Sequence, residues 1–115
     1  MQNEEMESPE VANVVETPDE WSADLKFDPS AQYFQGHFPG FPVLAGVVQL
    51  GVAHRIAEKW TGRQLALKTV KKLKFSRVVQ PGETVRLSLA RKSDSEISFV
   101  YAKKGSPCAT GTLCF

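Results

Sequence analysis

One histidine, His37, stands in a stiff loop where its side chain could transfer protons. Glycines and prolines surround it in the run Gly36-His37-Phe38-Pro39-Gly40-Phe41-Pro42. Proline fixes φ and biases the residue before it towards extended conformations, while glycine permits backbone shapes that other residues resist. Because imidazole titrates near neutral pH, a histidine held ahead of a helix is a candidate general base. The alternative is a packed loop with a hydrogen-bonded histidine.

The loop leads into a predicted helix over residues 46–60, with Gly62 as its C-terminal stop. Residues 47–53 contain no charged side chain and one polar side chain, Gln49. The titratable residues of the helix come later, and they are His54, Arg55, Glu58 and Lys59. A helix that is apolar on every side is buried. We therefore expect the fold to wrap the first half of this helix and the second half to emerge into water.

Alternating apolar and polar residues predict the remaining elements as strands. Turn residues separate them, such as Asp28-Pro29-Ser30 and Pro81-Gly82. The expected strands cover residues 21–27, 65–79, 83–91, 96–104 and 108–115. One strand, one buried helix and then antiparallel strands make an α+β fold, in which the sheet curls round the helix. A small sheet over a single helix leaves one face and one edge open, so we expect a dimer formed by edge-to-edge pairing.

Charge divides the chain unevenly. Residues 1–20 hold seven of the 13 acidic residues and no Lys or Arg, so the rest carries 14 basic and six acidic residues, a net charge of +8. We expect 1–20 to be an acidic flexible tail, with at most a helical turn at 11–15, and 21–115 to be a single domain. A basic domain can attract an acidic protein, anionic lipid or nucleic acid. Nucleic acid is the weakest of these, because the cations lack interleaved aromatics.

Several classes of protein are disfavoured by the composition. No apolar run approaches the roughly 20 residues that span a bilayer, and the N-terminus lacks the pattern of a secretory signal. Cys108 and Cys114 would lie roughly 20 Å apart along one strand, too far for a disulfide. No Cys and His spacing of a zinc site occurs. We therefore expect a cytoplasmic protein without a metal or cofactor.

Two segments resemble one enzyme family. The run Gly36-His37-Phe38-Pro39-Gly40-Phe41-Pro42-Val43-Leu44-Ala45-Gly46-Val47-Val48-Gln49-Leu50 resembles the active-site loop and helix start of hotdog-fold 3-hydroxyacyl-acyl-carrier-protein dehydratases. The run Lys74-Phe75-Ser76-Arg77-Val78-Val79-Gln80-Pro81-Gly82-Glu83 resembles the family's strand and Pro-Gly-acid turn. The Val-Val-Gln-Leu run is most similar to the small branch of aryl-polyene pigment biosynthesis. The resemblance covers residues 21–115.

The resemblance implies a role for each matching residue. His37 would remove the α-proton of a carrier-bound 3-hydroxyacyl thioester, with its ring oriented by the backbone at Val43. The amide of Gly46 would polarise the thioester carbonyl, as a free N–H at a helix N-terminus can. Phe38 and Gln49 would line the substrate site. The product would be a trans-2-enoyl thioester, and the acidic acyl carrier protein would suit the basic domain.

Gly51 departs from the family pattern. The family carries an Asp or Glu there, as the acid that protonates the leaving hydroxyl. His54, three residues on, could move a proton or could instead pair with Glu58 at i+4, and Gln49 could bind the hydroxyl without acting as an acid. In the family, the histidine and the acid of one site come from different protomers. A heterodimer with an acid-bearing relative would therefore complete one site, whereas a homodimer would have none complete.

Three functions remain open from the sequence. The first is a dehydratase, or dehydratase-like protein, in fatty-acid or polyene biosynthesis with His37 as base. The second is a non-catalytic or heterodimer-partner subunit that lacks the helix acid. The third is an acyl thioesterase, because one fold hosts both reactions.

Overall fold

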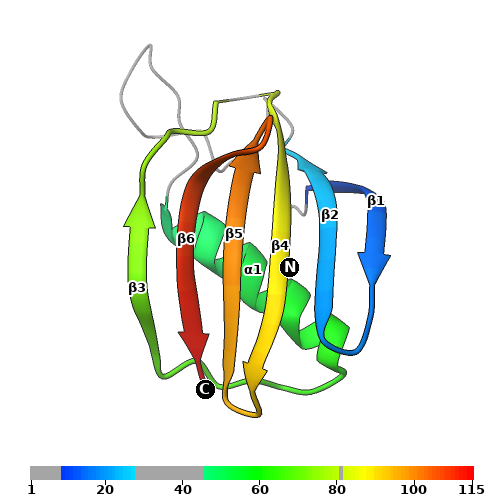
Figure 1. Cartoon of the computed structure of the whole chain (residues 1–115), viewed down its shortest axis with the longest axis vertical. Coiled ribbons are helices and arrows are strands. Elements are labelled where there is room, and N and C mark those ends of the chain that lie inside the picture. The colour runs from blue at the N-terminus through cyan, green and yellow to red at the C-terminus, as the bar shows by residue number, and fades with distance from the viewer. Residues whose placement is uncertain (1–8, 28–45, 81) are drawn as a thin grey trace, which may run out of the picture.

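The sheet and helix are formed by three stretches of the chain. The computed structural model describes residues 9–27, 46–80 and 82–115. The elements, in chain order, are β1 (Glu10–Glu16), β2 (Glu20–Lys26), α1 (Gly46–Thr61), β3 (Thr69–Phe75), β4 (Thr84–Ser93), β5 (Glu96–Lys103) and β6 (Ser106–Cys114). They form a six-stranded sheet in the order β1-β2-β4-β5-β6-β3, with antiparallel pairing throughout. Helix α1 crosses one face of this sheet diagonally (Figure 1). The predicted α+β architecture is thereby confirmed.

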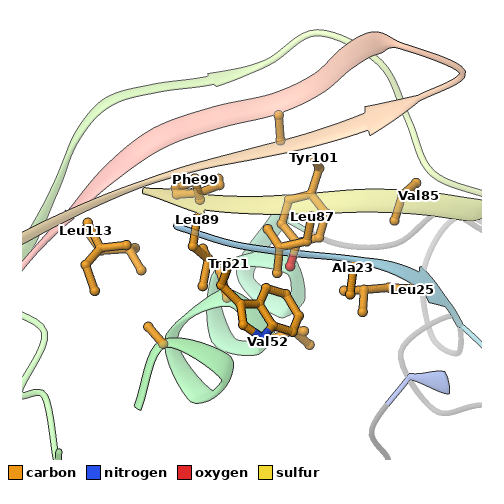
Figure 2. Packing of buried hydrophobic residues seen from close by; sticks show 14 of the residues in the cluster. Trp21, Ala23, Leu25, Val52, Val85, Leu87, Leu89, Phe99, Tyr101 and Leu113 are labelled. Carbon is orange, nitrogen blue, oxygen red and sulfur yellow. The ribbon is translucent and has the colours of Figure 1, made fainter. Parts of the chain in front are cut away.

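The core lies between α1 and the facing side of the sheet. The alternation predicted for the strands is confirmed, because alternate residues of β2, β4 and β5 are buried while their neighbours are not. Figure 2 shows these side chains converging on the helix around Val52. The buried hydrophobic strand residues are Trp21, Ala23, Leu25, Val85, Leu87, Leu89, Ile97, Phe99, Tyr101, Cys108, Ala109 and Leu113.

Helix α1 is packed on one side rather than wrapped. Its buried residues are Gln49, Val52, Ala53 and Ala57. The expectation that the first half is enclosed was wrong: Val47 is 76% exposed, and Gly51, one turn later, is also exposed. The physical reason is that a single sheet covers only one side of a cylinder. Among the residues that the structure describes, none covers the side of the first two helical turns that carries Val47 and Gly51, and this side is called the uncovered helix strip.

Strand β1 corrects a second expectation. Residues 10–16 belong to the segment expected to be a flexible tail with a turn of helix, yet they pair with β2 as the outermost strand of the sheet. Every residue of β1 is exposed, so main-chain hydrogen bonds rather than apolar burial hold it in place. The Trp60 indole also donates to the carbonyl of Thr17 at 3.1 Å, which ties the β1–β2 turn to α1. The limits of the domain stay a prediction.

Both outermost strands are irregular. The pairing register shifts between Ala12 and Val15 in β1, and between Lys71 and Lys74 in β3. A residue with positive φ lies inside each shift, Asn13 at 56° and Lys72 at 55°. β3 is also shorter than the strand predicted over residues 65–79. Such irregularities bend a strand and interrupt its ladder.

The remaining predictions on cysteines and membrane segments can be checked in the described parts of the chain. Cys108 and Cys114 are both free, as expected. Among residues 9–27, 46–80 and 82–115, no helix has the length and hydrophobicity needed to cross a bilayer.

Candidate active site

The predicted site divides between described and undescribed residues. His37, Phe38 and Val43 lie outside the described residues, so their predicted roles stay predictions. The other predicted positions all lie on α1: Gly46, Gln49, Gly51 and His54. The helix thus fixes one wall of the candidate site.

Gly46 begins α1, as the sequence predicted. The end of the Phe75 ring lies directly against it: a β-carbon built on Gly46 would be 2.6 Å from Cζ of Phe75 and 3.0 Å from Cε2. Real β-carbons do not approach a neighbour this closely, so the residue that starts the helix has to be a glycine unless the ring moves. The main-chain N–H groups of a first helical turn lack intrahelical acceptors. Gly46 therefore combines a main-chain N–H that has no acceptor within the helix with a close aromatic neighbour.

Gln49 anchors the second turn of α1 in the core. The residue is 3% exposed, and its main-chain carbonyl accepts a hydrogen bond from the Tyr101 hydroxyl at 2.7 Å. Burial raises the pKa of Tyr101 far above its usual range, so the hydroxyl stays a neutral donor. This bond fixes the helix against β5. Tyr101 falls within the strand predicted over residues 96–104, and no sequence pattern distinguishes its hydroxyl from the other buried side chains of that strand.

Gly51 stands where the resemblance expects an acid. It is exposed, and a β-carbon built there would meet no atom within 4 Å among the residues described, apart from its chain neighbours and the adjoining helix backbone. It follows Val47 by four residues, so both lie on one side of the helix. Nothing in the described structure prevents a larger side chain at this position. The missing acid is therefore not a consequence of steric exclusion within the described chain.

His54 is held by the segment that follows α1. Its Nε2 lies 2.5 Å from the carbonyl oxygen of Leu65 and 3.7 Å from Oε2 of Glu58, and its ring stacks on Phe115 with centroids 6.0 Å apart. The Glu58 carboxylate also accepts the Leu65 N–H at 2.8 Å. The predicted alternative of pairing with Glu58 is thus present. An accessory role in proton transfer stays a prediction, and it would compete with these contacts.

A set of hydrogen bonds centred on Lys103 and Glu83 holds the segment that follows β3. The Lys103 ammonium donates to the carbonyl of Val78 at 2.8 Å and to the Glu83 carboxylate at 3.0 Å. The Gln80 N–H donates to the same carboxylate at 2.7 Å, and this bond, with the help of Lys103, holds the pKa of Glu83 below its ordinary value. The acid of the Pro-Gly-acid motif therefore has a positioning task, since it ties residues 78–83 to β5. No part of the sequence pattern singled out Lys103.

Comparisons with known proteins show which family this chain resembles in sequence. The sequence profile of the ApeI-like family, described as ApeI dehydratase, matches residues 13–112. The chain is 38% identical over 65 residues to the 3-hydroxyacyl-[acyl-carrier-protein] dehydratase FabZ of Clostridium acetobutylicum. The aligned residues make up 50% of this chain and 46% of that relative. The chain spans about half the length of the curated relatives it matches.

Two solved structures show the same fold. The structure described as the dehydratase heterocomplex ApeI:P from Xenorhabdus doucetiae matches with a TM-score of 0.86 and 24% identity, over 94% of this chain and 97% of that chain. Zebra fish thioesterase superfamily member 2 matches with a TM-score of 0.60 and 11% identity, over 87% and 76%. At these identities the likeness concerns the fold alone. It confirms the predicted hotdog architecture, in which one helix packs on an antiparallel sheet.

The protein is therefore a hotdog-fold member of the dehydratase class. More narrowly, the chain belongs to the ApeI-like dehydratase family, because that family's profile covers most of its length. The resemblance drawn from the two sequence motifs is confirmed.

Proposed function

We propose that this protein provides half of a 3-hydroxyacyl-acyl-carrier-protein dehydratase site. Family membership and the FabZ relatives support the reaction class. His37 would take the α-proton, and the Gly46 N–H would stabilise the negative charge that develops on the thioester oxygen. The bond between C3 and the hydroxyl would then break, a double bond would form between C2 and C3, and the hydroxyl would leave as water after accepting a proton.

The observation that carries the half-site proposal is the open position at Gly51. A hydroxide is a poor leaving group, so the departing oxygen needs a proton from an acid. Gly51 has no side chain, and apart from its chain neighbours and the adjoining helix backbone no described atom lies within 4 Å of where its β-carbon would be. The Glu58 carboxylate is the nearest helical acid on that side, but it is bound to the Leu65 N–H. The chain therefore needs an acid from elsewhere.

A related protomer is the proposed source of the completed site. Because the family builds each site from the histidine of one protomer and the acid of the other, an acid-bearing relative would pair its acid with His37 of this chain. The structural neighbour ApeI:P is itself described as a dehydratase heterocomplex. The uncovered helix strip at Val47 and Gly51 is where an additional protein surface could lie.

The substrate would arrive on an acidic carrier protein. The net charge of +8 over residues 21–115 supports such a partner. On β3, three lysines point into water at the edge of the sheet, Lys71, Lys72 and Lys74. Lys71 is paired with Glu96 at 2.6 Å. Lys72 and Lys74 add positive charge to β3 itself. This strand ends at Phe75, whose ring lies beside the start of α1.

The test is a mass-spectrometric assay of carrier protein loaded with a 3-hydroxyacyl chain. We expect little enoyl product from the chain alone and clear product from the Gly51→Asp variant, because the substitution restores an acid where space is open. The double variant His37→Ala with Gly51→Asp should lose that product. The matched control is Gly62→Asp, which adds the same acid in the turn after α1 and should gain nothing.

Each other outcome would change the proposal. Full activity of the unaltered chain alone would show that no acid is needed at Gly51. No product from Gly51→Asp, even together with an acid-bearing relative, would support a non-catalytic subunit. Accumulation of free 3-hydroxy acid would instead identify a thioesterase, which is the function of other proteins with this fold.

A further inference from the structure

A row of side chains crosses the helix-facing side of the sheet near the start of α1. The pairing registers place Ala23 opposite Leu87, Leu87 opposite Tyr101, Tyr101 opposite Ala109, and Ala109 opposite Phe75. The first four residues are fully buried, whereas Phe75, at the outer end, is 46% exposed. The row thus begins in the core and ends in an aromatic ring that is half uncovered.

The direction of the Phe75 ring is fixed by its contact with α1. The three ring atoms nearest to a β-carbon on Gly46 are Cζ, Cε2 and Cε1, at 2.6, 3.0 and 3.1 Å. These atoms form the far end of the ring, so the ring points at the backbone of Gly46 and covers one side of it. The neighbouring residue Lys74 pairs with Thr110 on the opposite, outer side of the sheet. Phe75 therefore belongs to the helix-facing side of the sheet and not to the side that carries Lys74.

We infer that Phe75 determines specificity by limiting the bulk of the acyl chain next to the thioester carbonyl. This inference rests on the proposed function, in which that carbonyl accepts a hydrogen bond from the Gly46 N–H. A carbonyl bound there would bring C2 of the acyl chain beside the ring, because the ring already contacts Gly46. A straight chain would lie along the apolar ring face. A methyl branch on C2 would collide with it.

The occupant of this surface is taken to be an acyl chain because of its position. The ring lies beside main-chain donors at a helix start, where a polar carbonyl and an apolar tail would both be satisfied. It is directed towards α1 and away from the outer edge of β3, along which another sheet would pair. A second protein chain packed on the ring is the competing occupant, and the experiment separates the two.

The experiment measures binding, so it does not depend on turnover. The probes are 3-hydroxyhexanoyl pantetheine with an amide in place of the thioester, and its 2-methyl counterpart. We expect the unaltered full-length protein to prefer the unbranched probe, and Phe75→Ala to shift the ratio of the two Kd values by about tenfold towards the branched probe. Phe75→Leu, which keeps an apolar core contact, should shift the ratio in the same direction. The matched control is Leu73→Ala, on the same strand with 42% exposure.

The outcomes are distinguishable. If both probes bind and Phe75→Ala leaves their Kd ratio unchanged, the inference is wrong while the proposed function stands. If the unaltered protein binds neither probe, the proposed function and the inference both fail. If Phe75→Ala changes the sedimentation coefficient and leaves the Kd ratio as it was, the ring packs against a second chain instead. If Phe75 had only a structural role, its substitution would raise the Kd of both probes by the same factor, because damage to the fold does not distinguish a branched from an unbranched chain.

Discussion

At the scale of single residues, Gly46 and Phe75 are matched in size. The ring occupies the volume that any side chain at position 46 would need. The two residues are distant in the sequence, and each was predicted for its own reason, Gly46 as the helix start and Phe75 as an apolar strand position. Their contact could not be predicted, because it depends on how far the edge strand β3 reaches over the helix. The tertiary packing decides that distance.

A double-mutant cycle tests this match. We expect Gly46→Ala to lower the free energy of unfolding by about 1–3 kcal/mol, since overpacking forces the ring to move. In a Phe75→Leu background the same change should cost much less, because the ring atoms nearest to Gly46 are gone. Urea denaturation of the four proteins gives the coupling energy directly. Equal costs in both backgrounds would show that the two residues do not interact.

At the scale of elements, α1 shows what a sequence can and cannot reveal. Its start and length follow from the apolar run and from Gly62. The sequence also indicates that the first turns are apolar apart from Gln49, but it does not say what covers each side. The sheet covers the side of Val52 and Ala53, whereas Val47 remains exposed. The expectation that the first half of α1 is enclosed was wrong because one sheet can cover only one side of a helix.

The strands likewise divide into those that the sequence pattern predicts and one that it does not. Those with regular alternation, β2, β4 and β5, were predicted well. β1 was missed because the register shift between Ala12 and Val15 breaks its alternation, and Asn13 takes a positive φ inside that shift. The period of two on which strand prediction depends is lost within seven residues. The predicted site positions on α1 do fall on the helix, because the signals for its start and end are local in the sequence, while their roles stay predictions.

Gly51 offers a direct test at this scale. Glycine in an exposed helix interior costs about 1 kcal/mol relative to alanine, and the position has open space. We therefore expect Gly51→Ala to raise the free energy of unfolding of the isolated chain by about 1 kcal/mol in thermal denaturation. Gly111→Ala is the contrast: its β-carbon would lie 2.8 Å from Cε2 of Phe99, so it should destabilise. Destabilisation by Gly51→Ala would mean that something already packs on that side of α1.

At the scale of the whole molecule, the uncovered helix strip predicts association. Val47→Glu places a charge on a valine that is 76% exposed, so it should leave the isolated fold intact and abolish pairing with a second copy or a relative. Val15→Glu is the matched control, because Val15 is 57% exposed and lies on β1, the edge strand at the other side of the sheet from β3. Native mass spectrometry of each variant mixed with an acid-bearing relative reads the result. Persistent dimers with Val47→Glu would exclude this side of α1 from the interface.

The irregular edges of the sheet have a further consequence, which concerns what the protein avoids. Flat, unbroken edge strands recruit more strands, and repeated recruitment produces fibres. Here both edges carry a register shift, with Asn13 and Lys72 twisting the backbone at positive φ. An added strand can therefore pair with only part of either edge, which limits edge-to-edge contact to short ladders. The molecule can therefore leave one side of the first turns of α1 exposed and still resist open-ended polymerisation.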